Sequence, residues 1–189
     1  DISFTFIAKP NQTRANIDHS GIMVKSATDP GFVLMTEEDD NTPDQVTFNT
    51  SAGGWQKILG DLDLDGEYHN YTCVFDEGSG TTTMTLYIDG TQVSTTTYNG
   101  GVGSISGTTG IYIGGDSGGG QDFFGEISSV SIWNKALTAS EIAADLYGKW
   151  IGTETDLIAA WNFESDLLDA TSNDSDLTMV GSATYTDIP

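Results

Sequence analysis

The chain has 189 residues, the size of a single domain, and its eight Phe, seven Tyr and four Trp supply enough large apolar side chains for a sizeable core. Six Lys and Arg against 28 Asp and Glu give a formal net charge of -22. This charge argues against nucleic acid and anionic membranes as partners, because both are bound through clustered basic side chains. No apolar run approaches the roughly 20 residues of a membrane span, so membrane insertion is not expected. The chain starts without an initiator Met or a signal-like segment, and we expect a domain of a longer protein.

Most of the sequence alternates short apolar runs with turn-rich stretches, the pattern of β-strands joined by turns. Asp89-Gly90 lies between two alternating runs and predicts a tight hairpin. Cys73 is the only cysteine and lies within such a run, so we expect a buried, inert thiol and no disulfide. In chain order, the expected strands cover residues 2–8, 21–26, 31–36, 45–50, 55–60, 67–76, 83–98 with the hairpin, 111–116, 124–132 and 157–163.

One short helix is expected near residues 139–147. Thr138 and Glu141 have the spacing of a capping box, and Leu137 and Ile142 have that of a hydrophobic staple. A glycine after the segment supplies a stop. Isolated helices shorter than about 12 to 15 residues rarely persist in water, so this helix is expected to pack against the edge of the sheets.

Roughly a dozen strands with one helix predict an all-β fold, a two-sheet antiparallel sandwich formed as a single domain over residues 1–189. The order EYHNYTCVFD, LYIDGTQV, IYIGGD and FFGEISSVSIWNKALTASEIAADLY resembles the laminin-G-like and pentraxin-like domains of the concanavalin A-like superfamily, over residues 2–147. This resemblance implies a jelly roll with a short helix after the last core strand. It also implies a lectin-like module of a large secreted bacterial adhesin.

The C-terminal segment 156–181 departs from the family pattern. Its sequence LIAAWNFESDLLDATSNDSDLTMVG resembles the strand that opens such domains, although here it comes last. The segment either fills the strand position before Ile2 or begins a second, truncated repeat. We expect the first arrangement, because an unpaired sheet edge is an aggregation liability. Trp161 and Phe163 are then expected to be buried in a strand of the main core.

Known catalytic and metal-binding motifs find poor matches in the sequence. Retaining glucanases need two carboxylates about 5 to 5.5 Å apart, but no E-x-D-x-E or E-x-D-x-x-E run occurs, and the acidic run 37–40 lies in a turn-rich stretch. Residues 61–66 match the start of an EF-hand loop, yet Thr72 stands where that loop needs a bidentate Glu. We therefore expect Asp65-Gly66 to form a plain turn. Two histidines and no G-x-S-x-G elbow argue against Ser-His-Asp catalysis.

The segment 169–176 is the candidate cation site. Ca²⁺ prefers six to eight oxygen ligands, and a turn rich in Asp and Asn can supply several of them together. We expect Ca²⁺ as a candidate cofactor, and the alternative is an Asx-rich turn that satisfies its own backbone. The candidate ligands are Asp169, Asn173, Asp174 and also Glu126, which would neighbour the turn if the last segment fills the opening strand position.

Glycans are commonly bound by an aromatic face together with planar polar side chains that loops carry over a rigid sandwich. The candidate glycan-binding residues are Trp55, Asp116, Gln121 and Asp122. A core position is the alternative for Trp55, and we assign Trp133 and Trp161 to packing.

We therefore expect a non-catalytic extracellular carbohydrate-binding or adhesion module, secreted or held at a cell surface. Its expected partners are a glycan or cell-surface ligand and the neighbouring domains of a longer chain. One alternative is a structural spacer domain of a surface protein. A polysaccharide hydrolase or lyase is the other, and the missing carboxylate pair disfavours it.

Overall fold

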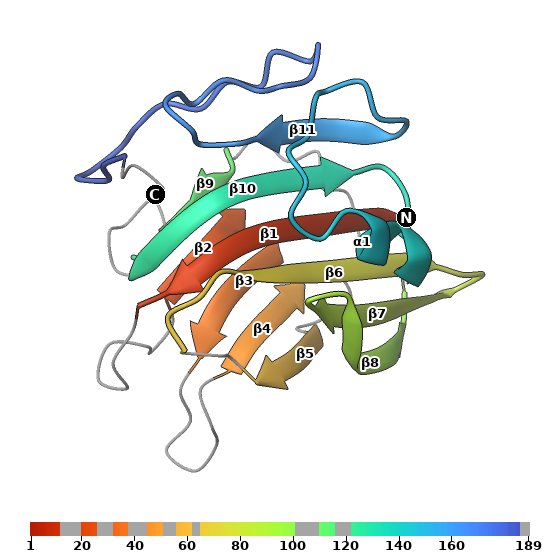
Figure 1. Cartoon of the computed structure of the whole chain (residues 1–189). Coiled ribbons are helices and arrows are strands. Elements are labelled where there is room, and N and C mark those ends of the chain that lie inside the picture. Colours follow the sequence, from red (N-terminus) through yellow and green to blue (C-terminus); the bar gives the residue numbers. More distant parts are fainter. Residues whose placement is uncertain are drawn as a thin grey trace.

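The computed structural model describes residues 1–11, 20–25, 32–37, 45–50, 56–61, 65–100, 110–115 and 122–185, of which 20–25, 32–37 and 45–50 are described by their backbone alone. As the sequence predicts, the fold is all-β, with two antiparallel sheets. Helix α1 (Ala139–Ala144) lies on the near face of the larger sheet in Figure 1. Within the described ranges, no helix is long and apolar enough to cross a membrane.

The larger sheet has six strands in the order β11-β10-β1-β6-β7-β8. Asp89 and Gly90 join β7 to β8 with φ angles of 48° and 74°, the left-handed pair that a tight hairpin requires, so the predicted turn is confirmed. The strands are β1 (Ile2–Pro10), β6 (His69–Glu77), β7 (Thr81–Ile88), β8 (Thr91–Asn99), β10 (Gly125–Trp133) and β11 (Leu157–Trp161).

The smaller sheet has five strands in the order β5-β4-β3-β2-β9. It lies behind the larger sheet in Figure 1, so the two sheets form the layers of a sandwich. Its strands are β2 (Ser20–Lys25), β3 (Phe32–Glu37), β4 (Gln45–Thr50), β5 (Gln56–Asp61) and β9 (Tyr112–Ile113).

The main core lies between the two sheets. Phe4 and Phe6 alternate along β1 toward the smaller sheet, and they pack in one fully buried cluster with Phe75 of β6. Ile58 of β5 joins this cluster from the smaller sheet. Cys73 also belongs to it as a free, buried thiol, and burial raises its pKa well above the ordinary value. The predicted buried position of Cys73 is thus confirmed.

The C-terminal segment supplies β11, which pairs with β10 at the edge of the larger sheet (Figure 1). Trp161 is 2% exposed and packs into the main core, as predicted. The prediction for Phe163 was wrong, because this residue lies beyond the strand with a φ of 46° and is only partly buried. The left-handed residue lies outside the strand alternation, and its side chain packs against the core from the edge without being fully buried. That residues 1–189 form a single domain stays a prediction.

Helix α1 begins at the predicted capping box but ends earlier than predicted. The Glu141 N–H donates to Thr138 Oγ1 at 3.3 Å, and the Thr138 N–H donates to Glu141 Oε2 at 2.9 Å. At the other end, Asp145 leaves the helical conformation with φ -136° and ψ 44°. The next carbonyl, that of Leu146, accepts a hydrogen bond from Asn70 Nδ2 at 2.6 Å. The helix therefore stops at residue 144 instead of 147, and the bond from Asn70 ties the segment that follows it to the sheet.

A second, smaller apolar cluster lies between α1 and the outer face of the larger sheet. Leu137 and Ile142 both pack in it, as the staple predicts, together with Val74 of β6. The rings of Trp133 and Trp150 meet edge to face in this cluster, with centroids 5.0 Å apart. Because so short a helix is unstable alone, this packing is what keeps α1 on the sheet.

Candidate functional site

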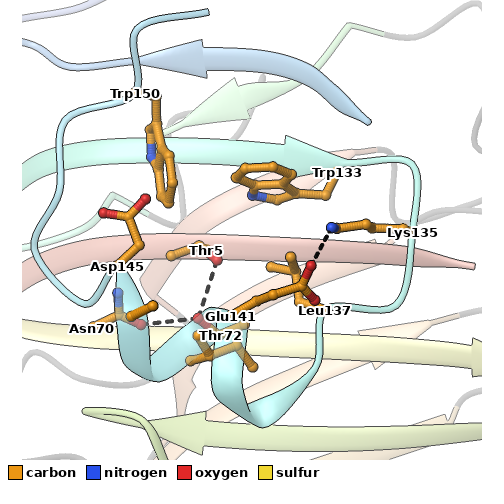
Figure 2. A pocket seen from close by; sticks show the side chains of 11 residues that line it. Thr5, Asn70, Thr72, Trp133, Lys135, Leu137, Glu141, Asp145 and Trp150 are labelled. Atoms are coloured by element: carbon orange, nitrogen blue, oxygen red, sulfur yellow. Dashed lines mark hydrogen bonds and ion pairs between the residues drawn. The ribbon is translucent and has the colours of Figure 1, made fainter. Parts of the chain in front are cut away.

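A pocket of about 240 Å³ lies between α1, the segment that follows it and the outer face of the larger sheet (Figure 2). We call it the α1 pocket. It is lined by polar side chains of β1 and β6, by the two tryptophans of the second apolar cluster and by residues of α1 and its C-cap. The residues used below are Thr5, Asn70, Thr72, Trp133, Asp145 and Trp150.

The floor of the α1 pocket is a short chain of hydrogen bonds. Thr72 Oγ1 donates to Asn70 Oδ1 at 2.9 Å and lies 3.1 Å from Thr5 Oγ1. Asn70 Nδ2 in turn donates to the carbonyl of Leu146. Thr5, Asn70 and Thr72 are each at most 4% exposed, so these polar groups hold fixed positions away from bulk solvent. Such a floor is preorganised for hydrogen bonding.

The wall formed by Trp150 is positioned by the C-terminal segment. Asn162, which directly follows β11, accepts a hydrogen bond from the Trp150 N–H at 3.3 Å and donates one to the Trp150 carbonyl at 2.9 Å. The Trp150 side chain is 5% exposed, and its Nε1 is buried with no hydrogen-bond partner in the described part of the chain. A buried, unpartnered N–H is uncommon in native proteins and calls for an explanation.

Asp145 lies beside Trp150 at one end of the α1 pocket. Figure 2 shows the nitrogen of the Trp150 ring on the side where the Asp145 carboxyl lies. Burial and the negative charge of Glu154 raise the pKa of Asp145. Gly148 fits so closely against this carboxyl that a side-chain carbon there would overlap Asp145 Oδ1. The carboxyl therefore lies directly against the Gly148 backbone.

The opposite end of the α1 pocket carries an ion pair. Lys135 Nζ lies 2.5 Å from Glu141 Oε1 and 5.8 Å from the centroid of the Trp133 ring. The hydrogen bond from Lys135, with those from Thr138, lowers the pKa of Glu141 to about 2. Glu141 thus balances the positive charge of Lys135. Lys135 therefore offers no unpaired charge to the end of the pocket where Asp145 lies.

A cluster around Asp89 ties the segment after α1 to the sheet. Asp89 Oδ1 accepts hydrogen bonds from the Asn70 N–H at 2.9 Å and from the Tyr147 hydroxyl at 2.8 Å. His69 contacts two carboxylates, with Nδ1 2.7 Å from Asp89 Oδ2 and Nε2 3.1 Å from Asp65 Oδ1. Burial lowers the pKa of His69, but these two hydrogen bonds outweigh it and raise the pKa. With both ring nitrogens engaged, His69 is not placed to act as a catalytic base.

Only one of the four predicted glycan-binding residues lies in the part of the chain that the structure describes. Trp55, Asp116 and Gln121 lie outside the described residues. Asp122 is exposed and lies three residues before the start of β10, whereas Trp133 of the pocket is the last residue of that strand. Trp133 was assigned to packing, and it both packs and lines the pocket. A glycan-binding role for the four predicted residues stays a prediction.

The predicted calcium turn is built around the Asp169 carboxylate. Oδ1 accepts hydrogen bonds from the N–H groups of Ala160 and Thr171, both at 3.0 Å. Oδ2 accepts from Thr171 Oγ1 at 2.8 Å and from the Ser175 N–H at 3.0 Å. Burial raises the pKa of Asp169, but these hydrogen bonds outweigh it and lower the pKa. The turn thus satisfies its own backbone, the alternative that the sequence left open.

The other turn residues add little to a metal site. Asn173 Nδ2 donates to the Ile158 carbonyl at 2.7 Å, and Asp174 is exposed. Across the described ranges, no group of three or more His, Cys, Asp and Glu side chains lies close enough together to hold a metal ion. The donor set present does not fit Ca²⁺, and calcium binding by this domain stays a prediction.

Glu126 is not brought to the turn. Its carboxylate accepts a hydrogen bond from the Tyr68 hydroxyl at 2.8 Å and pairs with Lys9 Nζ at 2.5 Å. Along β10 it is five residues from Ser131, the partner of Ala160 in β11. At about 3.4 Å per residue, Glu126 and Ser131 lie about 17 Å apart along the strand. The grouping of Glu126 with the turn was therefore wrong, because the two lie at different points along β10.

Asp169→Ala is expected to lower the free energy of unfolding by about 2 to 3 kcal/mol, because it leaves several donors of the turn unpaired. The loss should be the same in millimolar CaCl₂ and in EGTA at fixed ionic strength, as measured by thermal melting. Asp174→Asn removes an exposed carboxylate of the same turn and should change neither melting curve. A calcium-dependent rise in melting temperature that disappears in Asp169→Ala would instead support a cation site.

Two packed antiparallel sheets, with a short helix that follows β10 in the chain, define a concanavalin A-like jelly roll. The Laminin_G_3 family, described as the Concanavalin A-like lectin/glucanases superfamily, matches residues 1–143 of the chain. The chain belongs to this family. Asp145 and Trp150 lie beyond the matched residues, so one side of the α1 pocket is built outside them. No curated protein matches the sequence.

Several solved structures share the fold at low sequence identity. A proposed carbohydrate binding protein from Bacteroides ovatus has a TM-score of 0.65 and 18% identity, over 87% of this chain and 45% of that protein. Domain 4 of AbnA, an extracellular GH43 arabinanase from Geobacillus stearothermophilus, was solved with arabinotriose and has a TM-score of 0.57 and 17% identity, over 76% of this chain and 65% of that one. The CBM40 of Ruminococcus gnavus IT-sialidase, bound to α2,3-sialyllactose, has a TM-score of 0.54 and 14% identity, over 76% of this chain and 80% of its own. The chain thus spans less than half of the first of these proteins.

Sequence reasoning missed Asn70, Asp145 and Trp150. Asn70 lies in a strand whose alternation predicts the face of the sheet that it occupies. Nothing in that pattern marks it as part of a site. Asp145 was placed inside a longer helix, and Trp150 lies in a segment without periodicity. The available signal for the site was the pair Trp133 and Trp150, which lie before and after the short helix in the sequence. A helix this small needs large apolar partners, so both residues could have been placed beside it.

Proposed function

We propose that this domain is a non-catalytic carbohydrate-binding module of a secreted or cell-surface protein. The α1 pocket carries the proposal, because it combines two indole rings with buried hydrogen-bonding groups. Saccharides are bound by such sites, where apolar walls contact C–H groups and a few fixed polar groups orient the hydroxyls. Two solved structures of the same fold hold a saccharide, arabinotriose in one and α2,3-sialyllactose in the other, which supports this class of ligand.

One observation favours a polysaccharide hydrolase as the second candidate function. Asp145 has a raised pKa and feels the charge of a second carboxylate, Glu154, as glycosidase acids do. However, Glu154 Oε1 accepts a hydrogen bond from the Ile151 N–H at 2.9 Å, and Glu154 is not among the residues that line the α1 pocket. A general acid and a nucleophile must both face the same glycosidic bond. We therefore favour binding without hydrolysis.

A glycan array probed with the labelled domain, followed by isothermal titration of each glycan that binds, tests this proposal. We expect saturable binding to at least one class of polysaccharide or oligosaccharide and no release of reducing ends from it on prolonged incubation. Absence of binding across the array would favour a structural spacer. Release of reducing ends that Asp145→Asn abolishes would favour the hydrolase.

A further inference from the structure

The hydrogen bonds on the floor of the α1 pocket have a defined direction. A threonine hydroxyl has one proton, and Thr72 gives its proton to Asn70 Oδ1. The proton in the bond between the two threonine hydroxyls must then come from Thr5. Thr5 Oγ1 keeps its lone pairs, so the floor offers an acceptor to a molecule above it. A hydroxyl group of a ligand can donate to such an acceptor.

The end of the pocket beside Asp145 presents a donor next to an acceptor. Trp150 Nε1–H is a buried donor without a partner among the described residues, and leaving such a group unpaired costs about 1 to 3 kcal/mol. The Asp145 carboxyl, an acceptor that packs against Gly148, lies on the same side of the pocket (Figure 2). A hydroxyl accepts one hydrogen bond and donates another, so a single ligand hydroxyl can serve both groups. A carboxylate or phosphate group at this position lacks the proton for Asp145 and would add negative charge beside it.

The charge around this end disfavours anions further. Glu154 acts on Asp145 with a like charge, and the chain as a whole has a net charge of -22. Lys135, the lysine that lines the pocket, is paired with Glu141, and Lys149, which precedes Trp150, is paired with Glu164. An acidic sugar entering the pocket would therefore meet uncompensated negative charge, whereas a neutral sugar would not.

The size of the pocket sets the length of the ligand. A volume of 240 Å³ equals the share of about eight liquid water molecules, at about 30 Å³ each. It is smaller than the roughly 300 to 1,000 Å³ of pockets that bury a drug-sized ligand. One sugar ring fits such a volume and a run of several rings does not. Trp133, Leu137 and Ile142 supply apolar walls for the C–H groups of that ring.

We propose that the α1 pocket holds one terminal ring of a neutral saccharide, with a ring hydroxyl that accepts from Trp150 Nε1–H and donates to the Asp145 carboxylate. This inference rests on the proposed function and adds the residues, the ring count and the charge class of the ligand. Residues 144–189, beyond the family match, supply both of these groups and also Asn162, which positions Trp150. The pocket is thus a feature of this chain's own C-terminal segment as much as of the shared fold.

The test uses titration of the domain with methyl glycosides of galactose, glucose, mannose and arabinose, and with galacturonate, glucuronate and α2,3-sialyllactose. Heat of binding and tryptophan fluorescence are recorded together. We expect at least one neutral glycoside to bind and to change the fluorescence, with the acidic sugars at least tenfold weaker. Trp150→Phe keeps an aromatic ring against Trp133 but removes the N–H, and it should raise the Kd on the order of tenfold.

Asp145→Asn should raise the Kd for the neutral glycoside on the order of tenfold and narrow the difference from the acidic sugars. Trp161→Phe is the matched control, because its Nε1–H donates to the Ser175 carbonyl at 3.0 Å outside the pocket, and its Kd should equal that of the parent. Melting curves establish that each variant is folded. Asp145 is partly exposed, so Asp145→Asn tests the proposed site even if Trp150→Phe does not fold.

If the array detects a glycan whose Kd neither pocket variant changes, the proposed site is wrong while carbohydrate binding stands. Acidic sugars that bind as tightly as neutral ones would also overturn the inference. If no glycan of any kind binds, the proposed function itself fails.

Discussion

Trp161→Ala is expected to lower the free energy of unfolding by about 3 to 5 kcal/mol, the usual cost of truncating a buried tryptophan. Trp161 is 2% exposed, packs among the side chains between the sheets and donates a hydrogen bond from Nε1 to the Ser175 carbonyl. At about 2 to 4 °C per kcal/mol for a domain of this size, the melting temperature should fall by roughly 6 to 20 °C. Thermal melting followed by circular dichroism measures both quantities.

Deleting residues 157–189 should have a larger effect and abolish cooperative unfolding. The deletion removes β11 with its pairing to β10, and it uncovers both the main core and the second cluster, to which Ala159 and Ala160 contribute. Val180→Ser is the matched control, since Val180 is 77% exposed and its replacement should leave the melting curve unchanged. A truncated chain that melts as sharply and at the same temperature as the intact one would show that β11 is dispensable.

Much of the fold could be predicted because its signals are local. The capping box at Thr138 and Glu141 depends on residues three apart, and the hairpin at Asp89 and Gly90 depends on two neighbours. Strand alternation likewise placed Trp161 in the core. The C-terminal end of α1 was misplaced because Asp145 leaves the helical conformation and the next carbonyl bonds to a distant strand, and no local pattern encodes that contact.

The α1 pocket could not be predicted in the same way. Asn70 and Asp145 are 75 residues apart in the sequence, and only the packing of α1 on β6 brings them into one pocket. The calcium hypothesis shows the converse limit. Asp169 was chosen for the density of oxygen atoms around it, yet the structure commits those oxygens to backbone and hydroxyl donors of its own turn. Composition reveals which ligand atoms are present but not which partners already hold them.

The turn built by Asp169 has a structural task that links it to the pocket. Gly152 lies two residues after Trp150, and a side-chain carbon there would overlap the Ala170 carbonyl oxygen. Its φ of 83° also favours glycine. The turn therefore serves as the surface on which the Trp150 segment rests, and Asn162 fixes the same segment from the end of β11.

Gly152→Ala is accordingly expected to lower the free energy of unfolding by about 2 to 5 kcal/mol, from a left-handed conformation costing about 1 to 2 kcal/mol and from a backbone overlap that costs about 1 to 3 kcal/mol. Gly80→Ala is the matched control, since Gly80 has a φ of 86° and nothing within 4 Å of the added carbon, so it should lose only the conformational part. Because relief of the overlap requires a shift of the segment that carries Trp150, Gly152→Ala should also change tryptophan fluorescence and weaken binding of the neutral glycoside, whereas Gly80→Ala should do neither. Chemical denaturation of both variants gives the comparison. Equal losses of stability in the two would show that the Asp169 turn does not support the pocket wall.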